Sequence, residues 1–323
     1  MLGLKRLFNQ QEEMSNVIAG IEEGLHEQLV AGLSGSARTL YIASIYEKLN
    51  RPIVIITYNL LQAQKLYDDL LHIIRDDHVA LYPANELIGA EISVASPELK
   101  AQRIEVLNLL SKRKQGIVIV PIAGMRKIVA PAEVWKRYQL SLNLGDEVNI
   151  ESLLLQLVEM GYVRSDMVST PGEFSVRGGI IDVYPLTEQD PIRIELFDTE
   201  IDSIRTFSFD DQRSIDKRKE VTIGPATEIP FQKEDYQRLT EKLELGLKNS
   251  LKQIKDEKVK QELVENIGYD LERLRNGQKP EQLFKYLSIA YSEANSLIDY
   301  FSKDTILFVD EISRVIEMNE SLE

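Results

Sequence analysis

The chain has 323 residues, of which 52 are acidic and 38 basic, and it contains no cysteine. A net charge of −14 opposes nucleic-acid binding as the main task, because nonspecific affinity for DNA comes from Lys and Arg that neutralise phosphates. Without cysteine, and with only three histidines, neither a disulfide framework nor a zinc site is expected. No apolar run reaches the roughly 18 residues of a membrane span, and the first residues lack the apolar core of a signal peptide. We therefore expect a cytoplasmic protein with no membrane partner.

The first part of the chain, up to residue 136, alternates short apolar runs with amphipathic segments. The apolar runs are typical of strands buried on both faces and lie at 53–56, 79–82 and 116–120. Helical periodicity covers the segments around them, at 8–28, 39–49, 60–74 and 96–113. Strands alternating with helices of this length predict an α/β layer built on a parallel sheet.

The pattern changes after residue 137. A helix at 150–160 is followed by short stretches with period-two alternation, at 173–177, 180–184, 192–197 and 203–209. They predict a small antiparallel sheet, in an α+β domain over 137–223 that is inserted into the first lobe. Residues 224–323 carry charged helices and then an apolar run at 305–309, so we expect this third part to return to the first sheet.

The loop from Gly32 to Thr39 has the frame of a phosphate-binding loop. A working loop has a second glycine followed by a lysine that reaches the terminal phosphates, and then a hydroxyl residue that holds Mg²⁺. Gly32 and Thr39 fit this scheme and Gly35 lies between them, but Ala37 and Arg38 stand where glycine and lysine are needed. A side chain at position 37 restricts the backbone, and the forked guanidinium of Arg38 does not replace a compact ammonium. We therefore expect no cofactor at this loop.

The other end of the chain carries a second feature of nucleotide hydrolases. The apolar run 307–309 leads into Asp310 and Glu311, as in a strand whose acids face a metal. An apolar strand followed by an acid is common, and Gly32–Thr39 alone could be an ordinary loop before a helix. Together, with the apolar residues 29–31 as the strand before the loop, they favour a P-loop NTPase-like fold that has lost its chemistry.

Two groups of motifs resemble UvrB, the damage-handling subunit of bacterial nucleotide excision repair. The segments that resemble its domain 2 lie at 161–162, 172–185, 192–198 and 200–205. The segments that resemble the end of its first ATPase lobe lie at 297–301 and 307–311. The resemblance is closer to the N-terminal UvrB-homology module of bacterial transcription-repair coupling factors (Mfd). Two departures from UvrB favour this second resemblance. One is the degraded loop at Gly32–Thr39. The other is the segment 84–91, which is short and nearly free of aromatic residues, whereas UvrB has a long aromatic-rich hairpin that grips DNA at this place.

The resemblance implies a module without catalytic residues, metal or cofactor, which binds UvrA and links stalled transcription to repair. Within the family, two arginines and one phenylalanine of domain 2 contact UvrA, and these positions fall on Arg177, Arg193 and Phe197. The resemblance also implies that the parent protein has a polymerase-interacting domain and an ATP-driven DNA translocase, which would contact RNA polymerase and DNA.

Strand alternation supports the same residues independently. Along 192–197 the aliphatic side chains fall on one face, while Arg193, Glu195 and Phe197 fall on the other. Because the aliphatic face must form the core, Phe197 is expected to point outward beside charged residues. An outward aromatic next to arginine is typical of a protein interface.

Other interpretations of these residues stay open at this point. Phe197 could tuck under a loop, with the arginines paired to Glu195, Asp198 or Glu200. The chain could also be a UvrB-like ATPase that still binds nucleotide, or a direct DNA-binding module whose affinity falls steeply with salt.

Overall fold

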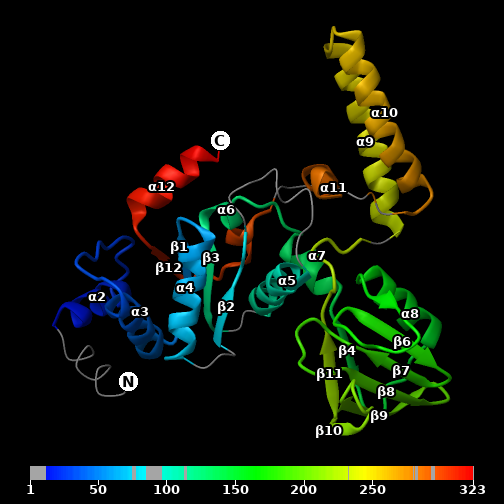
Figure 1. The fold of residues 1–323 in the computed structure, drawn as a ribbon, viewed down its shortest axis with the longest axis horizontal. Helices are drawn as coiled ribbons and strands as arrows, with labels where there is room; N and C mark the ends of the chain where they lie inside the picture. The colour runs from blue at the N-terminus through cyan, green and yellow to red at the C-terminus, as the bar shows by residue number, and fades with distance from the viewer. Residues whose placement is uncertain are drawn as a thin grey trace. The chain divides into compact units, whose positions relative to one another are not determined.

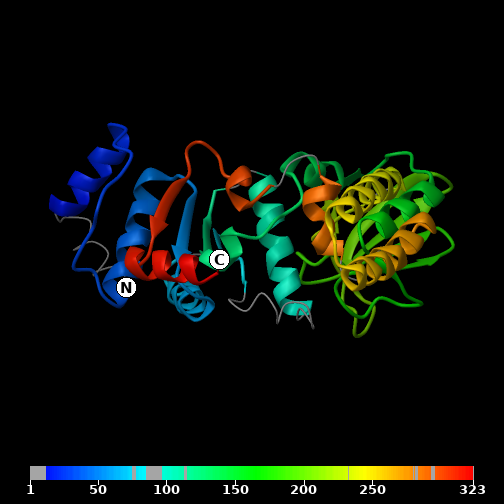
Figure 2. The ribbon, with the colours of Figure 1, turned by 90° about the horizontal axis from the view of Figure 1, so that it is seen from above.

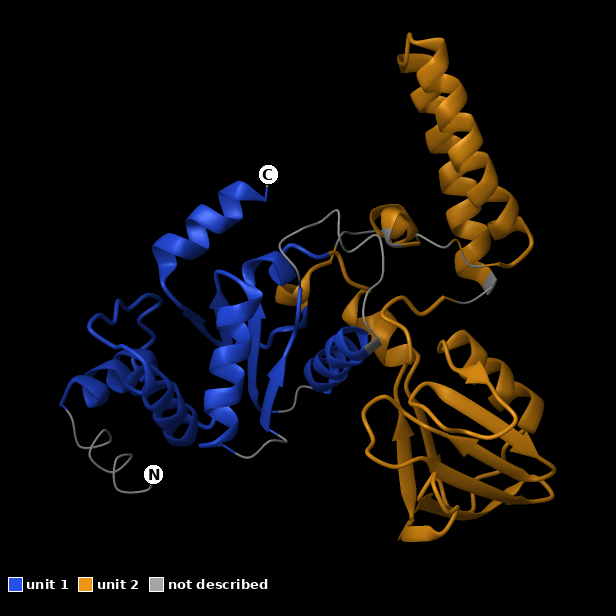
Figure 3. Cartoon of the chain, viewed as in Figure 1, with its two compact units in different colours: residues 1–127, 300–323 blue, residues 128–299 orange. Residues whose placement is uncertain are grey.

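The computed structural model describes residues 12–74, 78–84, 97–112, 115–231, 233–278, 280, 283–291 and 295–322. The chain forms two compact units (Figure 3), one of residues 1–127 with 300–323 and the other of residues 128–299. The helices between 233 and 275 belong to the second of these units. The threefold division at 136 and 223 stays a prediction from the sequence.

Unit 1 is built on a four-stranded parallel sheet in the order β12-β1-β3-β2 (Figure 1). Its strands are β1 (Ile53–Thr57), β2 (Val79–Leu81), β3 (Ile117–Pro121) and β12 (Ile306–Val309). β1 pairs in parallel with β3 on one side and with β12 on the other. The parallel α/β layer predicted from the sequence is confirmed, and the last strand of the chain lies beside the first.

Apolar helix faces cover this sheet. The helices that the structure describes in unit 1 are α2 (Glu12–Glu22), α3 (Ser36–Leu49), α4 (Leu60–Leu71), α5 (Pro97–Ser111), α6 (Ile122–Met125) and α12 (Ile312–Ser321). Ile42 and Ile45 of α3 and Leu66 of α4 share one buried cluster with Ile53 and Ile55 of β1. Asn59 begins α4 by accepting a hydrogen bond from the Gln62 backbone, which satisfies a free amide of the first turn.

The strand expected at 29–31, before the loop, does not form. Leu29 is 88% exposed and Val30 39%, and neither residue pairs with the sheet. Three apolar residues gain little from burial unless a neighbouring strand holds their backbone. The described sheet ends at β12, so the strand–loop–helix setting of a phosphate-binding loop lacks its strand here.

Unit 2 contains a six-stranded sheet in the order β10-β9-β8-β7-β6-β5. Its strands are β5 (Val163–Arg164), β6 (Glu173–Arg177), β7 (Ile180–Val183), β8 (Ile192–Phe197), β9 (Glu200–Phe207) and β10 (Ser214–Arg218). All neighbours pair antiparallel except β5 and β6, so the predicted antiparallel sheet is confirmed. A separate pair joins β4 (Leu140–Asn143) to β11 (Glu220–Ile223).

One face of the six-stranded sheet is the core of this part of unit 2. Ile181, Ile192 and Ile194 are fully buried in a cluster with Leu153 and Leu157 of helix α8 (Ile150–Glu159). The period-two alternation of β8 therefore turns its aliphatic residues toward α8, and Arg193, Glu195 and Phe197 lie on the opposite face. We call this opposite face of strands β6 to β9 the outer face.

Two long helices complete unit 2 and run side by side (Figures 1 and 2). They are α9 (Lys233–Gln253) and α10 (Glu257–Arg275), and the Asp256 carboxylate caps α10 by accepting from the backbone of Lys258. The shorter segments are α7 (Ala132–Arg137), η3 (Leu283–Tyr286), α11 (Leu287–Ala290) and η4 (Leu297–Tyr300). Among the helices that the structure describes, none is both long and apolar enough to cross a membrane.

Candidate functional site

Phe197 is the last residue of β8 and points into solvent. Its side chain is 79% exposed. Strand alternation places it on the same face of β8 as the charged residues Arg193 and Glu195. The hairpin to β9 turns immediately afterwards, at Asp198, whose φ of 56° is in the left-handed region. In the part of the chain that the structure describes, no loop covers the ring, so the alternative in which Phe197 is tucked away does not describe this structure.

Arg193 lies on the same face but is held inside a network. Its Nε and Nη2 donate to the two carboxylate oxygens of Asp182 at 2.7 and 2.8 Å, and Nη2 also donates to Gln212 Oε1 at 2.8 Å. The guanidinium carbon lies 4.2 Å from the centre of the Phe207 ring. The hydrogen bond from the guanidinium to Asp182 raises the pKa of Arg193, so this cation stays charged. Its ionic partner is not one of the three acids considered from the sequence.

Arg177, the third predicted residue, ends β6 and is more open than Arg193. Its side chain is 57% exposed, and Nη2 lies 3.8 Å from Oδ2 of Asp182. The two arginines therefore share one carboxylate, which is itself only 1% exposed. The structure brings Arg177 and Arg193 together through Asp182.

Sequence reasoning missed Asp182. It stands directly opposite Arg193 in the β7–β8 pairing and opposite Ser175 in the β6–β7 pairing. The signal was a single carboxylate within the apolar strand 180–183, because a buried charge needs a partner of opposite sign.

A second ion pair flanks the first on the outer face. Glu195 of β8 accepts from Ser203 Oγ at 2.8 Å and from Arg205 Nη1 at 3.0 Å, and it also pairs with Arg205 Nη2. Partial burial acts to raise the pKa of Glu195, but the hydrogen bonds from Ser203 and Arg205 outweigh it and the pKa is lowered. Glu195 and Arg205 are thus occupied with each other, and Arg177 is the more open cation beside Phe197.

The loop before α3 contains two glycines with positive φ. Gly32 and Gly35 have φ of 84° and 51°, a region that favours glycine. Gly35 is the N-cap of α3 and offers no side-chain hydrogen bond to the first turn. Ala37 lies in that first turn, and the Thr39 hydroxyl is buried without a hydrogen-bond partner among the described residues. The hydroxyl that would hold a metal therefore faces the interior.

Arg38 of the same loop is paired with the far end of the chain. Its Nη1 lies 2.7 Å from Oδ1 of Asp310 and 3.6 Å from Oε1 of Glu311. Gln62 donates to the other oxygen of Asp310 at 3.4 Å. Burial raises the pKa of Asp310, although the charge of Arg38 acts in the opposite direction. The cation and the acid that the sequence suggested for nucleotide chemistry neutralise each other.

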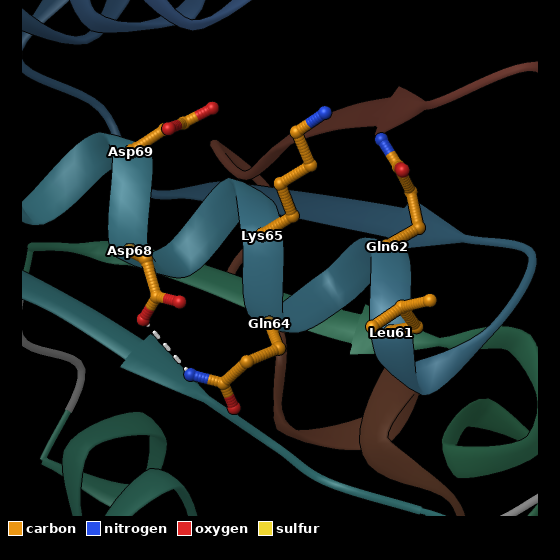
Figure 4. Close-up of a pocket in the computed structure, with 6 residues that line it drawn as sticks. All are labelled: Leu61, Gln62, Gln64, Lys65, Asp68 and Asp69. Atoms are coloured by element: carbon orange, nitrogen blue, oxygen red, sulfur yellow. Dashed lines mark hydrogen bonds between the residues drawn. The ribbon is translucent and has the colours of Figure 1, made fainter.

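A shallow hollow of about 510 Å³ lies on the exposed side of α4 (Figure 4). The six residues that line it all belong to this one helix, and Gln64 donates to Asp68 at 2.9 Å across it. Among the described residues there is no group of three or more His, Cys, Asp or Glu that could hold a metal. The segment 85–91, which the sequence comparison with UvrB singled out, lies outside the described residues.

Comparison with known proteins finds relatives of part of unit 2 and of the chain as a whole. The family model of the UvrB interaction domain matches residues 140–229. The whole chain is 49% identical to a transcription-repair-coupling factor of Bacillus subtilis and covers 27% of it. Over 93% of the chain the identity is 40% to a transcription-repair-coupling factor of Staphylococcus aureus, of which 25% is covered. The chain spans about a quarter of the length of these curated relatives.

Proposed function

Since this chain is a UvrB-homology module of the transcription-repair coupling factor (Mfd) family, we propose that it recruits the repair machinery without chemistry of its own. It binds UvrA through the outer face of its UvrB interaction domain, the face that carries the predicted residues Arg177, Arg193 and Phe197. We assign ATP-driven translocation, and the contacts with RNA polymerase and DNA, to other parts of the parent protein.

The observation that carries this proposal is the exposure of Phe197. An aromatic ring that is 79% exposed on a charged sheet face loses the stabilisation that burial of its apolar area gives. Aromatic and arginine side chains supply most of the free energy of typical protein interfaces. Phe197 and the open Arg177 therefore form the kind of surface that a protein partner covers, within the domain that the UvrB interaction family matches.

The test is the affinity of this chain for purified UvrA. Phe197→Ala is expected to weaken binding at least about thirtyfold, since loss of an interface hot spot costs about 2 kcal/mol or more. Leu155→Ala is the matched control, because Leu155 is 61% exposed on α8, on the core side of the sheet. Equal affinity of wild type and Phe197→Ala would remove the proposal.

The absence of nucleotide chemistry is supported by Arg38. Its guanidinium is engaged by Asp310, so neither group is free to meet a phosphate or a metal. We expect no change in melting temperature with millimolar Mg-ATP, whereas a ligand at 100 times its dissociation constant would stabilise the fold by about 2.7 kcal/mol. A concentration-dependent rise would instead favour a nucleotide-binding module with a divergent loop.

A further inference from the structure

The two arginines of the outer face differ in what they can offer a partner. Arg193 already donates to both oxygens of Asp182 and to Gln212, and its side chain is 14% exposed. To reach a partner it would have to leave a carboxylate that is almost fully buried, which leaves that charge unpaired. Arg177 is 57% exposed and lies 3.8 Å from the same carboxylate, so it can keep this contact and meet a partner as well.

A further apolar side chain lies beside Phe197. Ile180 begins β7 and stands opposite Arg177 on one neighbouring strand and opposite Glu195 on the other. It therefore shares the outer face with Phe197. Because Phe197 lies two residues beyond Glu195 on β8, Ile180 and Phe197 are diagonal neighbours across the two strands, and such neighbours are about 7–8 Å apart. Ile180 is 37% exposed although it is aliphatic and lies within a sheet.

The turn before Ile180 fixes this arrangement. The backbone of Leu196 donates to Gly179 O at 2.8 Å, and a Cβ at Gly179 would lie 2.9 Å from Leu196 O. The β6–β7 turn is thus in close contact with β8 at the residue before Phe197. Arg177, Ile180 and Phe197 are held at one end of the outer face by backbone contacts.

Resting on the proposed function, we propose that Arg177, Ile180 and Phe197 are the side chains that touch UvrA, and that Arg193 and Asp182 are positioning residues beneath them. Asp182 holds the Arg177 guanidinium in place, and Arg193 fixes the Asp182 carboxylate through two hydrogen bonds. The partner surface that fits is an apolar pocket with a carboxylate at its rim, because Phe197 and Ile180 share the outer face with the open cation of Arg177.

The first arm of the test measures UvrA affinity for Ile180→Ala and for Ile215→Ala. Ile215 is a matched control, being 56% exposed on the edge strand β10. Ile180→Ala is expected to weaken binding about fivefold to tenfold, and Ile215→Ala by less than twofold. Equal affinities for Ile180→Ala and wild type would overturn the assignment of Ile180.

The second arm separates positioning from contact. Arg193→Leu combined with Asp182→Asn removes both charges of the pair, so no uncompensated carboxylate is left to prevent folding. Its loss of affinity is expected to be no greater than that of Arg177→Ala, and adding Arg177→Ala should cost less than it does in wild type. A full, independent loss in the triple variant, with an unchanged melting temperature, would show that Arg193 contacts UvrA itself.

The two proposals fail in different ways. If Phe197→Ala binds UvrA like wild type, whatever the affinity of Arg177→Ala, the proposed function is wrong. If both lose binding while Ile180→Ala keeps it, UvrA binding stands and only this division of roles is wrong.

Discussion

Arg38 and Asp310 form an ion pair at 2.7 Å although 272 positions separate them in the chain. Arg38 lies in the first turn of α3, and Asp310 directly follows the edge strand β12. The Asp310 backbone also donates to Ile56 O at 2.8 Å, which continues the β12–β1 pairing. The pair therefore connects the first turn of α3 to the end of the strand at the edge of the described sheet.

Arg38→Ala should destabilise the attachment of β12. Asp310 would remain largely buried, and among the described residues Gln62 would be its remaining side-chain partner, which costs about 1–3 kcal/mol. Hydrogen exchange of the β12 amides that pair with β1 is the measurement, and these amides should exchange faster in the variant. Arg38→Ala with Asp310→Asn is the control, and it should recover part of the loss because no buried charge is left unpaired.

The same variant should show a characteristic pH dependence. Burial already raises the pKa of Asp310 from its ordinary 3.8, and loss of Arg38 removes the charge that opposes this rise. For an acid whose pKa is higher in the folded state, the favourable contribution is present below the unfolded pKa and lost as the pH rises through the folded one. The defect of Arg38→Ala should therefore be largest near neutral pH and smallest below about pH 3.8. A defect that did not change with pH would contradict this explanation.

Glu173 provides a test with the opposite sign. Its carboxylate accepts from the backbones of Ser169 and Thr170 at 2.8 and 3.1 Å. Burial acts to raise the pKa of Glu173, but these hydrogen bonds outweigh it and lower the pKa below 4.5. The contribution is therefore present above pH 4.5 and lost as the pH falls through the folded value.

Glu173→Gln should lose about 1 kcal/mol at pH 7, since an amide oxygen accepts these bonds less strongly than a carboxylate. The difference from wild type should shrink below about pH 4.5. Urea unfolding followed by the fluorescence of Trp135, the only tryptophan and a fully buried one in unit 2, measures it. A constant difference across this range would mean that the carboxylate charge is not the cause.

Part of this structure could be predicted from residue order alone. Alternation along β8 was enough to place Ile194 in the core and Phe197 outside, because a strand has only two faces. The pairing of Arg193 with Asp182 could not be derived in that way. It depends on the register between β7 and β8, which hairpin geometry decides, and a shift of one residue would turn Asp182 to the other face.

Unit 1 also contains features that residue order alone does not predict. Residues 29–31 have a strand-like composition, yet Leu29 is exposed because no described strand pairs with it. The residue types around Arg38 predicted the loss of an activity. They did not predict that Arg38 pairs with Asp310, which lies near the other end of the given sequence. Local sequence patterns predicted most helices and strands, whereas the roles of residues such as Leu29 and Arg38 depend on contacts between distant parts of the chain.

Gly179→Ala should separate the geometry of the UvrA surface from the stability of the domain. A Cβ at this position would lie 2.9 Å from the backbone oxygen of Leu196, and neither backbone can give way without displacing the β6–β7 turn from β8. Because that contact sets Arg177 and Ile180 relative to Phe197, we expect UvrA affinity to fall at least about fivefold, or about 1 kcal/mol.

The neighbouring Gly178→Ala is the matched control for this prediction. Its Cβ would meet nothing within 4 Å, but its φ of 60° disfavours an L side chain, so a loss of about 1 kcal/mol in stability is expected. Gly178→Ala should thus melt earlier yet bind UvrA within twofold of wild type at a temperature where both are folded. If the two alanine variants bound UvrA equally well, the contact between Gly179 and Leu196 would not set the spacing of this surface, because only Gly179→Ala forces the two strands apart.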